Sequence, residues 1–349
     1  MAHNSDFLLR KERMDLTLAR AKENYLATLT LEGKSPETVV WHNKKLSAFL
    51  GFMEADGTAV KVCDLSVDDA RNFVRSLMER KTKYVQHKFH RETEGSLAPQ
   101  TIHGFVRSLK TFGSWLAEEG YTPEHIFERL QPPKVPQILI EPLTEDEIRR
   151  LITAISQDTL EGVRNYAVLL LFLDTGIRLS ELVNLELRHI DFVAGEFKVF
   201  GKGAKERIVP MGLNTRRAVL RYKEHARAEP MSANDPHLFL SMAGDPISKD
   251  AVEKLMQGLA RRAKIPRLHP HLLRHTFAVR YLMNGGDVFT LQKILGHTSL
   301  EMTRKYVSLA SGDVKEKHRQ YGPIDNLGLV ERKRGRPRNQ VRANSQSTL

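Results

Sequence analysis

Residues 196–211 read EFKVF-GKGAK-ERIVPM, two short runs of β-branched or aromatic residues joined by a glycine-flanked turn. This pattern is typical of a β-hairpin. It stands out because the sequence after residue 212 favours helices, apart from PHLFLS at 236–241. No internal repeat of about 20–50 residues is present, which excludes a solenoid. The second half of the chain is therefore predicted to be mainly helical with a small antiparallel sheet.

Four prolines separate this half from the rest of the chain. They lie in QPPKVPQILIEPL at 131–143, where they remove backbone donors and force extended conformations. Upstream, the starts Ser35-Pro36-Glu37, Ser66-Val67-Asp68-Asp69 and Pro99 each lead into an apolar-periodic run, which predicts three helices. The first domain is accordingly predicted to be all-helical.

The predicted fold class is mainly α with two domains, which suits a length of 349 residues. The second domain begins at Thr144-Glu145-Asp146-Glu147, a capping box that starts a helix through Leu151. The expected boundaries are an N-terminal extension at 1–14, a helical domain at 15–130, a stiff linker at 131–142, a mixed α+β domain at 143–328 and a tail at 329–349.

The charge of the chain indicates a polyanionic partner. Lys and Arg number 54 against 42 Asp and Glu, which gives a net charge of +12 and a pI near 9.7. This balance is typical of proteins that bind nucleic acid or an anionic membrane surface. The N-terminus is charged where a signal peptide is apolar, and the apolar run at 166–173 is too short to span a bilayer. Cys63, the single cysteine, excludes an internal disulfide framework. We expect a cytoplasmic protein.

Two basic segments leave alternatives open. The segment at 81–96 is either a solvated loop or an insertion that contacts phosphates. The segment at 331–349 carries six Arg or Lys and one Glu, a net +5, and has too few apolar residues to fold alone. Its KRGRPR run is either a non-specific basic tail or an AT-hook-like element that would enter an A·T minor groove through Arg334, Arg336 and Arg338.

Candidate chemistry begins with two motifs around the hairpin. In TGIRLSEL, Arg178 and Glu181 are three residues apart, so that the carboxylate can fix the orientation of the guanidinium. In GKGAKER, Lys202 lies at the tip of the hairpin between two glycines. A turn of this kind holds the lysine out from the sheet.

Two further motifs lie near the end of the second domain. In HPHLLRH, His271 and Arg274 share one helix face because they are three residues apart. In LGHTSLEMTRKY, His297 precedes Tyr306 by nine residues across a helix start at Ser299.

The four motifs, in this order, resemble those of the tyrosine recombinase (phage integrase) family. The resemblance covers residues 143–325, and the preceding helical domain resembles the family's core-binding domain, a SAM-like helical fold. Four motifs in the right order are far more specific than any one of them. The resemblance implies that the family's catalytic set is complete in this chain: Arg178, Lys202, His271, Arg274, His297 and Tyr306.

The resemblance implies a site-specific DNA recombinase for integration, excision or resolution of DNA elements. Tyr306 would attack a DNA phosphodiester and form a 3′-phosphotyrosyl link, while the two arginines bind the phosphoryl oxygens. His271 would be the general base, His297 a donor to the phosphate, and Lys202 the acid that protonates the 5′ oxygen. Glu181 would support the first arginine. This chemistry requires no cofactor and no metal.

By the same resemblance, the partner is a double-stranded DNA recombination site. Two domains would clamp a duplex half-site, and four protomers, alone or with a related recombinase, would synapse two sites on the nucleoid. The segment after Tyr306 would pack on a neighbouring protomer. The layout is Xer-like, and the 81–96 insertion together with the HRQYGPIDNL ending favours an integrase carried by a mobile element, such as a transposon.

Other interpretations explain fewer of these residues. His271 and His275 have the spacing of zinc ligands on a helix, but the general-base Glu of HExxH and a third ligand are missing, so His275 is assigned a structural role. Ser180 lacks the surroundings of a nucleophilic serine. A type IB topoisomerase would use almost the same chemistry without synapsis. A non-catalytic DNA-binding regulator gives no reason for Tyr306 and Lys202 together.

Overall fold

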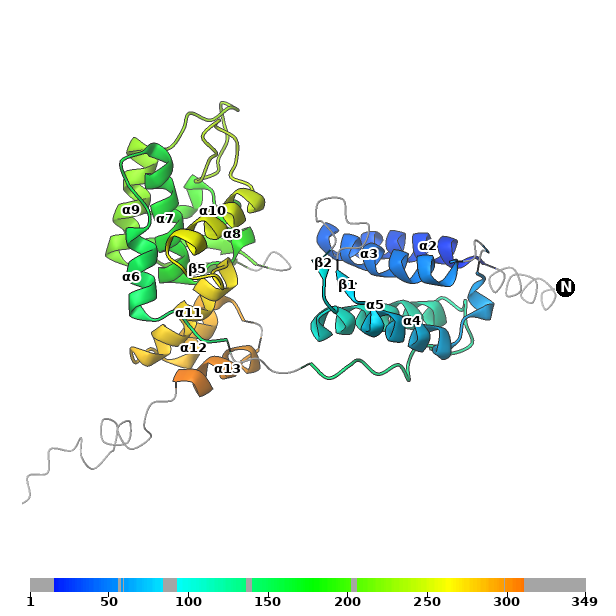
Figure 1. Cartoon of the computed structure of the whole chain (residues 1–349). Coiled ribbons are helices and arrows are strands. Elements are labelled where there is room, and N and C mark those ends of the chain that lie inside the picture. Colours follow the sequence, from blue (N-terminus) through cyan, green and yellow to red (C-terminus); the bar gives the residue numbers. More distant parts are fainter. Residues whose placement is uncertain are drawn as a thin grey trace, which may run out of the picture. The chain divides into compact units, whose positions relative to one another are not determined.

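The computed structural model describes residues 16–55, 58, 60–83, 93–135, 140–201, 206–297 and 299–310. By its contacts the chain divides into two compact units, unit 1 (Met1–Ile138) and unit 2 (Leu139–Leu349) (Figure 1). No helix among the described residues is long and apolar enough to cross a membrane. The expected N-terminal extension and the AT-hook-like tail lie outside the described residues.

Unit 1 is helical. Three of its described helices begin where the sequence predicts, and the first, capped by the Thr17 side chain, was not predicted. Ser35 caps one helix with its side chain, Ser66 forms a capping box with Asp69 at another, and Pro99 opens the longest. The apolar faces meet in a core rich in aromatic rings, such as Tyr25 and Phe112. The described elements are α2 (Leu18–Leu31), α3 (Pro36–Met53), the 3₁₀ turn η1 (Val62–Asp64), α4 (Val67–Glu79) and α5 (Pro99–Glu118).

A short ribbon adds strand structure to this helical unit. Strands β1 (Thr82–Lys83) and β2 (Thr93–Glu94) pair antiparallel at the two ends of the basic segment. The sequence interpretation treats the whole segment as a loop, because two-residue strands leave no alternation to detect. The basic residues between the two strands lie outside the described residues.

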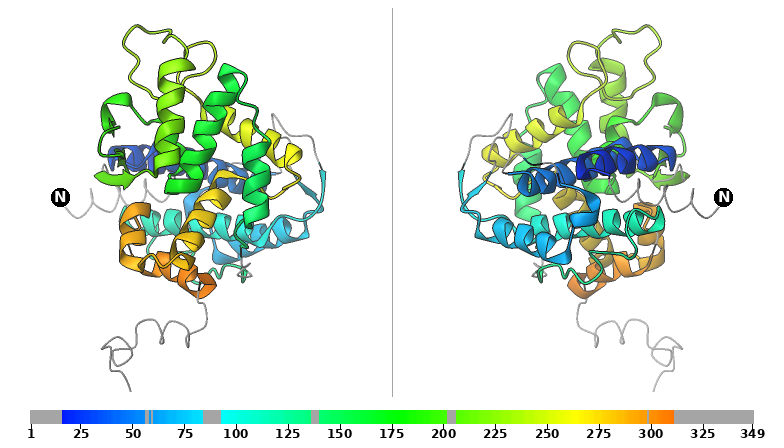
Figure 2. Two further views of the ribbon diagram at one scale, coloured as in Figure 1. Left: turned by 90° about the vertical axis from the view of Figure 1, so that its left-hand side faces the viewer. Right: turned by 90° about the vertical axis from the view of Figure 1, so that its right-hand side faces the viewer.

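Unit 2 is also mainly helical, with one three-stranded sheet among its described residues. Helices α7 and α9 lie side by side in both views of Figure 2, and both contribute buried residues to the core of the unit. Thr144 and Glu147 form the expected capping box at the first helix of the unit. The helices are α6 (Glu145–Thr153), α7 (Leu160–Thr175), α8 (Leu179–Val183), the 3₁₀ turn η2 (Leu187–His189), α9 (Leu213–His225), α10 (Lys249–Arg262), α11 (Pro270–Met283), α12 (Val288–Leu295) and α13 (Glu301–Ala310).

The predicted hairpin is confirmed and belongs to this sheet. Strands β4 (Glu196–Phe200) and β5 (Glu206–Pro210) pair antiparallel, and β3 (Ile190–Asp191) extends the sheet on the other side of β4. Val209 faces the core and has no exposed surface. Arg207, two residues earlier on β5, lies on the same face of the strand.

Helix α11 binds the chain segment that enters unit 2. Thr276 Oγ1 accepts the Leu143 amide at 2.9 Å, and the guanidinium of Arg280 donates to the Leu143 carbonyl at 3.0 and 3.1 Å. The His275 imidazole, from the residue before Thr276, contacts the Ile140 carbonyl at 2.5 Å. Residues 140–143 are thus held by the helix that carries His271 and Arg274.

Candidate active site

Two glycines in the left-handed conformation place two of the predicted catalytic residues. Helix α7 ends at Gly176, with φ 61°, where an added Cβ would lie 2.5 Å from the Phe277 ring, so only glycine fits. Arg178 follows as the N-cap of α8. Helix α12 ends in the same way at Gly296, with φ 63°, and His297 comes next. The glycine turns at the ends of α7 and α12 therefore fix the backbone positions of Arg178 and His297.

Arg274 joins these two helix ends. From α11 its guanidinium donates to the Gly176 carbonyl at 2.6 Å and to the Leu295 carbonyl at 2.7 Å. Carbonyls at helix C-termini carry partial negative charge, which suits a guanidinium. The same side chain contacts His297 Nε2 at 3.1 Å. Burial and the charge of Arg178 lower the pKa of Arg274 to about 10, so the group is still protonated at neutral pH.

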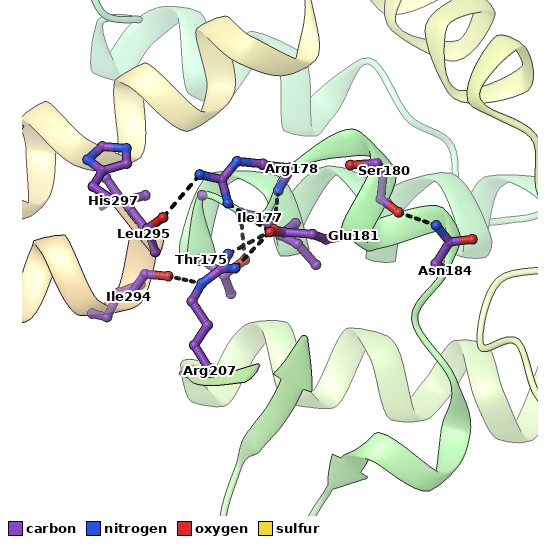
Figure 3. Close-up of polar contacts among 12 residues, drawn as sticks. Thr175, Ile177, Arg178, Ser180, Glu181, Asn184, Arg207, Ile294, Leu295 and His297 are labelled. Carbon is purple, nitrogen blue, oxygen red and sulfur yellow. Dashed lines mark hydrogen bonds and ion pairs between the residues drawn. The ribbon is translucent and has the colours of Figure 1, made fainter. Parts of the chain in front are cut away.

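Glu181 fixes Arg178, as its spacing predicts. Its carboxylate accepts the Arg178 amide at 2.9 Å and the Arg178 Nη1 at 2.8 Å. It also accepts both terminal nitrogens of Arg207, at 2.7 and 2.8 Å, so that one carboxylate lies between two guanidinium groups (Figure 3). Burial alone would raise the pKa of Glu181, but the hydrogen bonds from Arg207 and Arg178 outweigh it and hold the pKa at about 2. The carboxylate is therefore ionised throughout the physiological range.

Arg178 is the accessible arginine of the group. Its side chain is 30% exposed, whereas the whole of Arg274 is 5% exposed. Besides Glu181 it contacts the Gly296 carbonyl, at 3.3 Å from Nη2. Five nitrogen-bound protons in a planar fork leave donors for a phosphate in addition to these two partners.

His297 is held by partners on both ring nitrogens. Because a guanidinium can only donate, Nε2 accepts from Arg274, and the ring proton is placed on Nδ1. Nδ1 lies 2.9 Å from Thr303 Oγ1 on α13. A hydroxyl can accept from Nδ1 or donate to it, so Thr303 is compatible with either tautomer of His297.

Tyr306 lies on α13 in the same unit as the arginines. It is buried against α11 and α12, its ring stacks on His297 at 6.1 Å between centroids with an interplanar angle of 16°, and it lies 5.2 Å from the His275 ring. Burial raises the pKa of Tyr306 above that of an ordinary tyrosine, and the positive charges of Arg274 and Arg178 offset part of this rise. The phenol is consequently protonated at neutral pH and needs a base in order to act as a nucleophile.

His271 lies in the first turn of α11, one turn before Arg274, and is exposed. Desolvation lowers its pKa, and the charges of His269, Arg274 and Arg178 lower it further. At neutral pH the imidazole is therefore uncharged and able to accept a proton.

His275 is engaged as a structural group. Since the Ile140 carbonyl can only accept, the Nε2 of His275 carries a proton and donates to it. Within the described ranges, no group of three His, Cys, Asp or Glu could hold a metal ion. Among the described residues, His271 and His275 therefore have no third metal ligand beside them. The Nε2 of His275 is already engaged by the Ile140 carbonyl.

The structure describes Ser180 but not Lys202. Ser180 lies within α8, and its backbone carbonyl accepts a hydrogen bond from the Asn184 side chain at 2.8 Å. Asn184 is the residue that caps the end of this short helix. Lys202 lies outside the described residues, and its place in the site stays a prediction. The strand that follows it, β5, reaches the site through Arg207.

The sequence interpretation missed Arg207 and Thr303. Arg207 had a detectable signal, because strand alternation puts it on the same face as Val209, and a cation on a core-facing position needs a buried anion. Thr303 had none that separates it from an ordinary helical threonine. The described site as a whole contains the two guanidinium groups of Arg178 and Arg274 and the ionised carboxylate that fixes Arg178. It also contains the His297 imidazole, which contacts Arg274 and stacks on the phenol ring of Tyr306. Such a set can bind a phosphodiester and attack it.

Comparison with known proteins identifies relatives of the whole arrangement. The phage integrase family matches residues 141–312. The tyrosine recombinase XerC of Staphylococcus aureus (strain JH9) is 32% identical over 297 residues, which cover 84% of this chain and 94% of that protein.

Solved structures share the fold at lower identity. The Tn1549 transposon integrase bound to transposon right end DNA has a TM-score of 0.66 at 19% identity, covering 87% of this chain and 99% of that one. A lambda integrase dimer bound to a COC′ core site has a TM-score of 0.62 at 16% identity, covering 82% and 97%. These comparisons favour neither a topoisomerase nor a non-catalytic regulator.

Proposed function

The chain belongs to the tyrosine recombinase (phage integrase) family and is a site-specific recombinase, and we propose that Tyr306 is the nucleophile with which it cleaves and rejoins DNA. The observation that carries this proposal is the junction around Arg274. One buried guanidinium contacts the helix end that precedes Arg178 and also His297, and the ring of Tyr306 stacks on that histidine. Nucleophile and phosphate-binding groups are therefore assembled in one unit.

The reaction follows from the chemistry of these groups. The phenolic oxygen of Tyr306 forms a bond to phosphorus, the bond from phosphorus to the 5′ oxygen breaks, and the product is a 3′-phosphotyrosyl link. Arg178 and Arg274 stabilise the charge that develops on the non-bridging oxygens. Attack by a second 5′ hydroxyl reverses the step and rejoins the strands, so no external energy source is required.

Proton transfer falls to His271 and Lys202. Because burial raises the pKa of Tyr306, attack needs a base, and the lowered pKa of His271 keeps that imidazole neutral and available. By resemblance to the family, Lys202 gives its proton to the leaving 5′ oxygen.

His297 changes partner when phosphate binds. In the structure its Nε2 accepts from Arg274. A phosphate oxygen takes the Arg274 donor, and the imidazole then donates to the phosphate from Nε2. Thr303 is compatible with this tautomer, in which the single ring proton is on Nε2, because its hydroxyl can donate to Nδ1.

The test uses a nicked suicide DNA substrate resolved on a denaturing gel, with EDTA and no divalent metal. Wild-type protein is expected to form a covalent adduct, and Tyr306→Phe none, although it binds the DNA equally well. Tyr281→Phe is the matched control, since Tyr281 is a second tyrosine in unit 2, on α11. An adduct of normal yield with Tyr306→Phe would contradict the assignment. Mapping trapped adducts across a genome would give the site.

The same proposal covers the partner and the assembly. Unit 1 acts as the core-binding domain, with boundaries near 15–130, and the clamp closes around duplex DNA recombination sites on the nucleoid. Four protomers synapse two sites. The DNA-bound state of the Tn1549 and lambda integrase structures supports the choice of partner. The tail at 329–349, with its AT-hook-like run, adds contacts to flanking DNA.

A further inference from the structure

Arg207 makes contacts that join separate parts of the site. It lies on β5, and its side chain is 11% exposed. Its two terminal nitrogens donate to the two carboxylate oxygens of Glu181, at 2.7 and 2.8 Å, and its Nε donates to the Ile294 carbonyl at 2.6 Å. Figure 3 shows the guanidinium between Glu181 on one side and Ile294 on the other.

Each of these contacts leads to a residue of the proposed mechanism. Glu181 accepts both the backbone amide and the Nη1 of Arg178. Ile294 lies in the last turn of α12, three residues before His297. Arg207 itself follows the hairpin turn that carries Lys202.

The fit around Arg207 is close. An added Cβ on Gly296 would lie 3.0 to 3.2 Å from three atoms of the Arg207 side chain, so the turn before His297 packs directly on it. A planar fork can bind a carboxylate with two donors and keep a third for a carbonyl, whereas a lysine ammonium cannot reproduce this geometry. Removing one partner of a buried ion pair also leaves the other charge without compensation.

We propose that Arg207 is a positioning residue for recombination, which fixes Arg178 through Glu181 and at the same time holds the end of α12 that presents His297. The inference rests on the roles proposed above for Arg178 and His297. Arg207 does not touch the scissile phosphate. It acts by keeping two phosphate-binding groups in register with each other, and a misplacement of about 1 Å in such groups costs about 100-fold in rate.

The first test compares Arg207→Lys with wild type in single-turnover adduct formation on the suicide substrate. We expect the rate to fall about 100-fold, with DNA affinity within about threefold of wild type. The matched control is Arg164→Lys, because Arg164 is also buried (10% exposed), pairs with Glu161 and donates to the Leu240 carbonyl at 3.2 Å. This control should keep the wild-type rate. A wild-type rate in Arg207→Lys would overturn the proposal, because charge alone would then suffice.

A second measurement separates positioning from general damage to the fold. A methylphosphonate substrate carries a methyl group in place of one non-bridging oxygen, so it lacks the negative charge that the arginines stabilise. If Arg207 acts through Arg178, then the defects of Arg207→Lys and Arg178→Ala should both shrink on this substrate, by a similar factor. A defect of Arg207→Lys that is equal on both substrates would refute the inference.

A double variant keeps the test decisive if Arg207→Lys is too unstable to purify. Glu181→Gln with Arg207→Gln replaces the ion pair by two neutral amides and leaves no charge of this pair uncompensated. Its adduct rate should equal that of the slower single variant rather than the product of both effects. Multiplicative losses would show that Arg207 acts independently of Glu181. If wild-type protein itself forms no adduct, the proposed function fails instead, so the two failures are distinguishable.

Discussion

Glu181→Gln should lower the stability of unit 2 in a way that depends on pH. The Glu181 side chain is 3% exposed and its pKa is about 2, against 4.5 for an ordinary glutamate. The difference between these two values, at about 1.36 kcal/mol for each pH unit, corresponds to about 3 kcal/mol of folding free energy at pH 7. The glutamine variant loses this contribution.

The sign follows from the direction of the pKa. Because the folded-state pKa of Glu181 lies below the unfolded value, its contribution is complete above about pH 5 and is lost as the pH falls toward 2. The unfolding free energies of wild type and Glu181→Gln should therefore differ by about 3 kcal/mol more at pH 7 than near pH 2. Other carboxylates titrate equally in both proteins and cancel in the difference.

The assay can read the two units separately. Both tryptophans, Trp41 and Trp115, belong to unit 1, so their fluorescence follows unit 1 alone during urea unfolding. Far-ultraviolet circular dichroism follows the helices of both units. The substitution should shift the dichroism transition and leave the fluorescence transition in place. A difference between the proteins that is constant from pH 7 to pH 3, or a shift in fluorescence, would refute the reasoning.

Three other outcomes are expected. Lys202→Ala should cleave an ordinary diester about 10²–10⁴-fold more slowly, and should recover most of its rate when sulfur replaces the bridging 5′ oxygen, because a thiolate leaves without a proton. Arg178→Ala should not recover on that substrate; equal responses would remove Lys202 from the role of acid. Thr303→Val should slow adduct formation about 10-fold in a single-turnover time course, because His297 loses the partner that accepts either tautomer, whereas Thr303→Ser stays near wild type. Removal of 331–349, a net +5, should reduce the slope of log K against log salt by about 0.9 for each phosphate that the tail neutralises, as measured by fluorescence anisotropy on long DNA. An unchanged slope would show that the tail neutralises no phosphates.

Local chemistry made much of the fold predictable. Ser35, Ser66 and Thr144 cap helices with their side chains, and such caps are readable because they act within three residues. The hairpin at 196–211 was equally clear from its two runs and its turn. The β1–β2 ribbon was not, since strands of two residues have no periodicity.

In the candidate site, contacts between residues close in the sequence were predictable, and contacts between distant residues were not. Arg178 and Glu181 are close in sequence, so their ion pair follows from helix spacing. The hydrogen bond of Arg207 with Glu181 spans 26 positions, and that of Arg274 with the Gly176 carbonyl spans 98. Interactions at such separations are set by tertiary packing, which one sequence does not encode locally.

The hydrogen bonds between α11 and residues 140–143 determine where a chimera of this protein and a relative can be joined. The carbonyl of Ile140 and both backbone groups of Leu143 are bound by side chains of α11, and one of these, His275, contacts Tyr306. A chimera that joins a foreign DNA-binding domain upstream of Ile140 keeps this set of hydrogen bonds intact. One that joins at Leu143 replaces the chain that His275 holds beside Tyr306. Residues 140–143 continue a proline-rich stretch, but their hydrogen bonds make them part of unit 2.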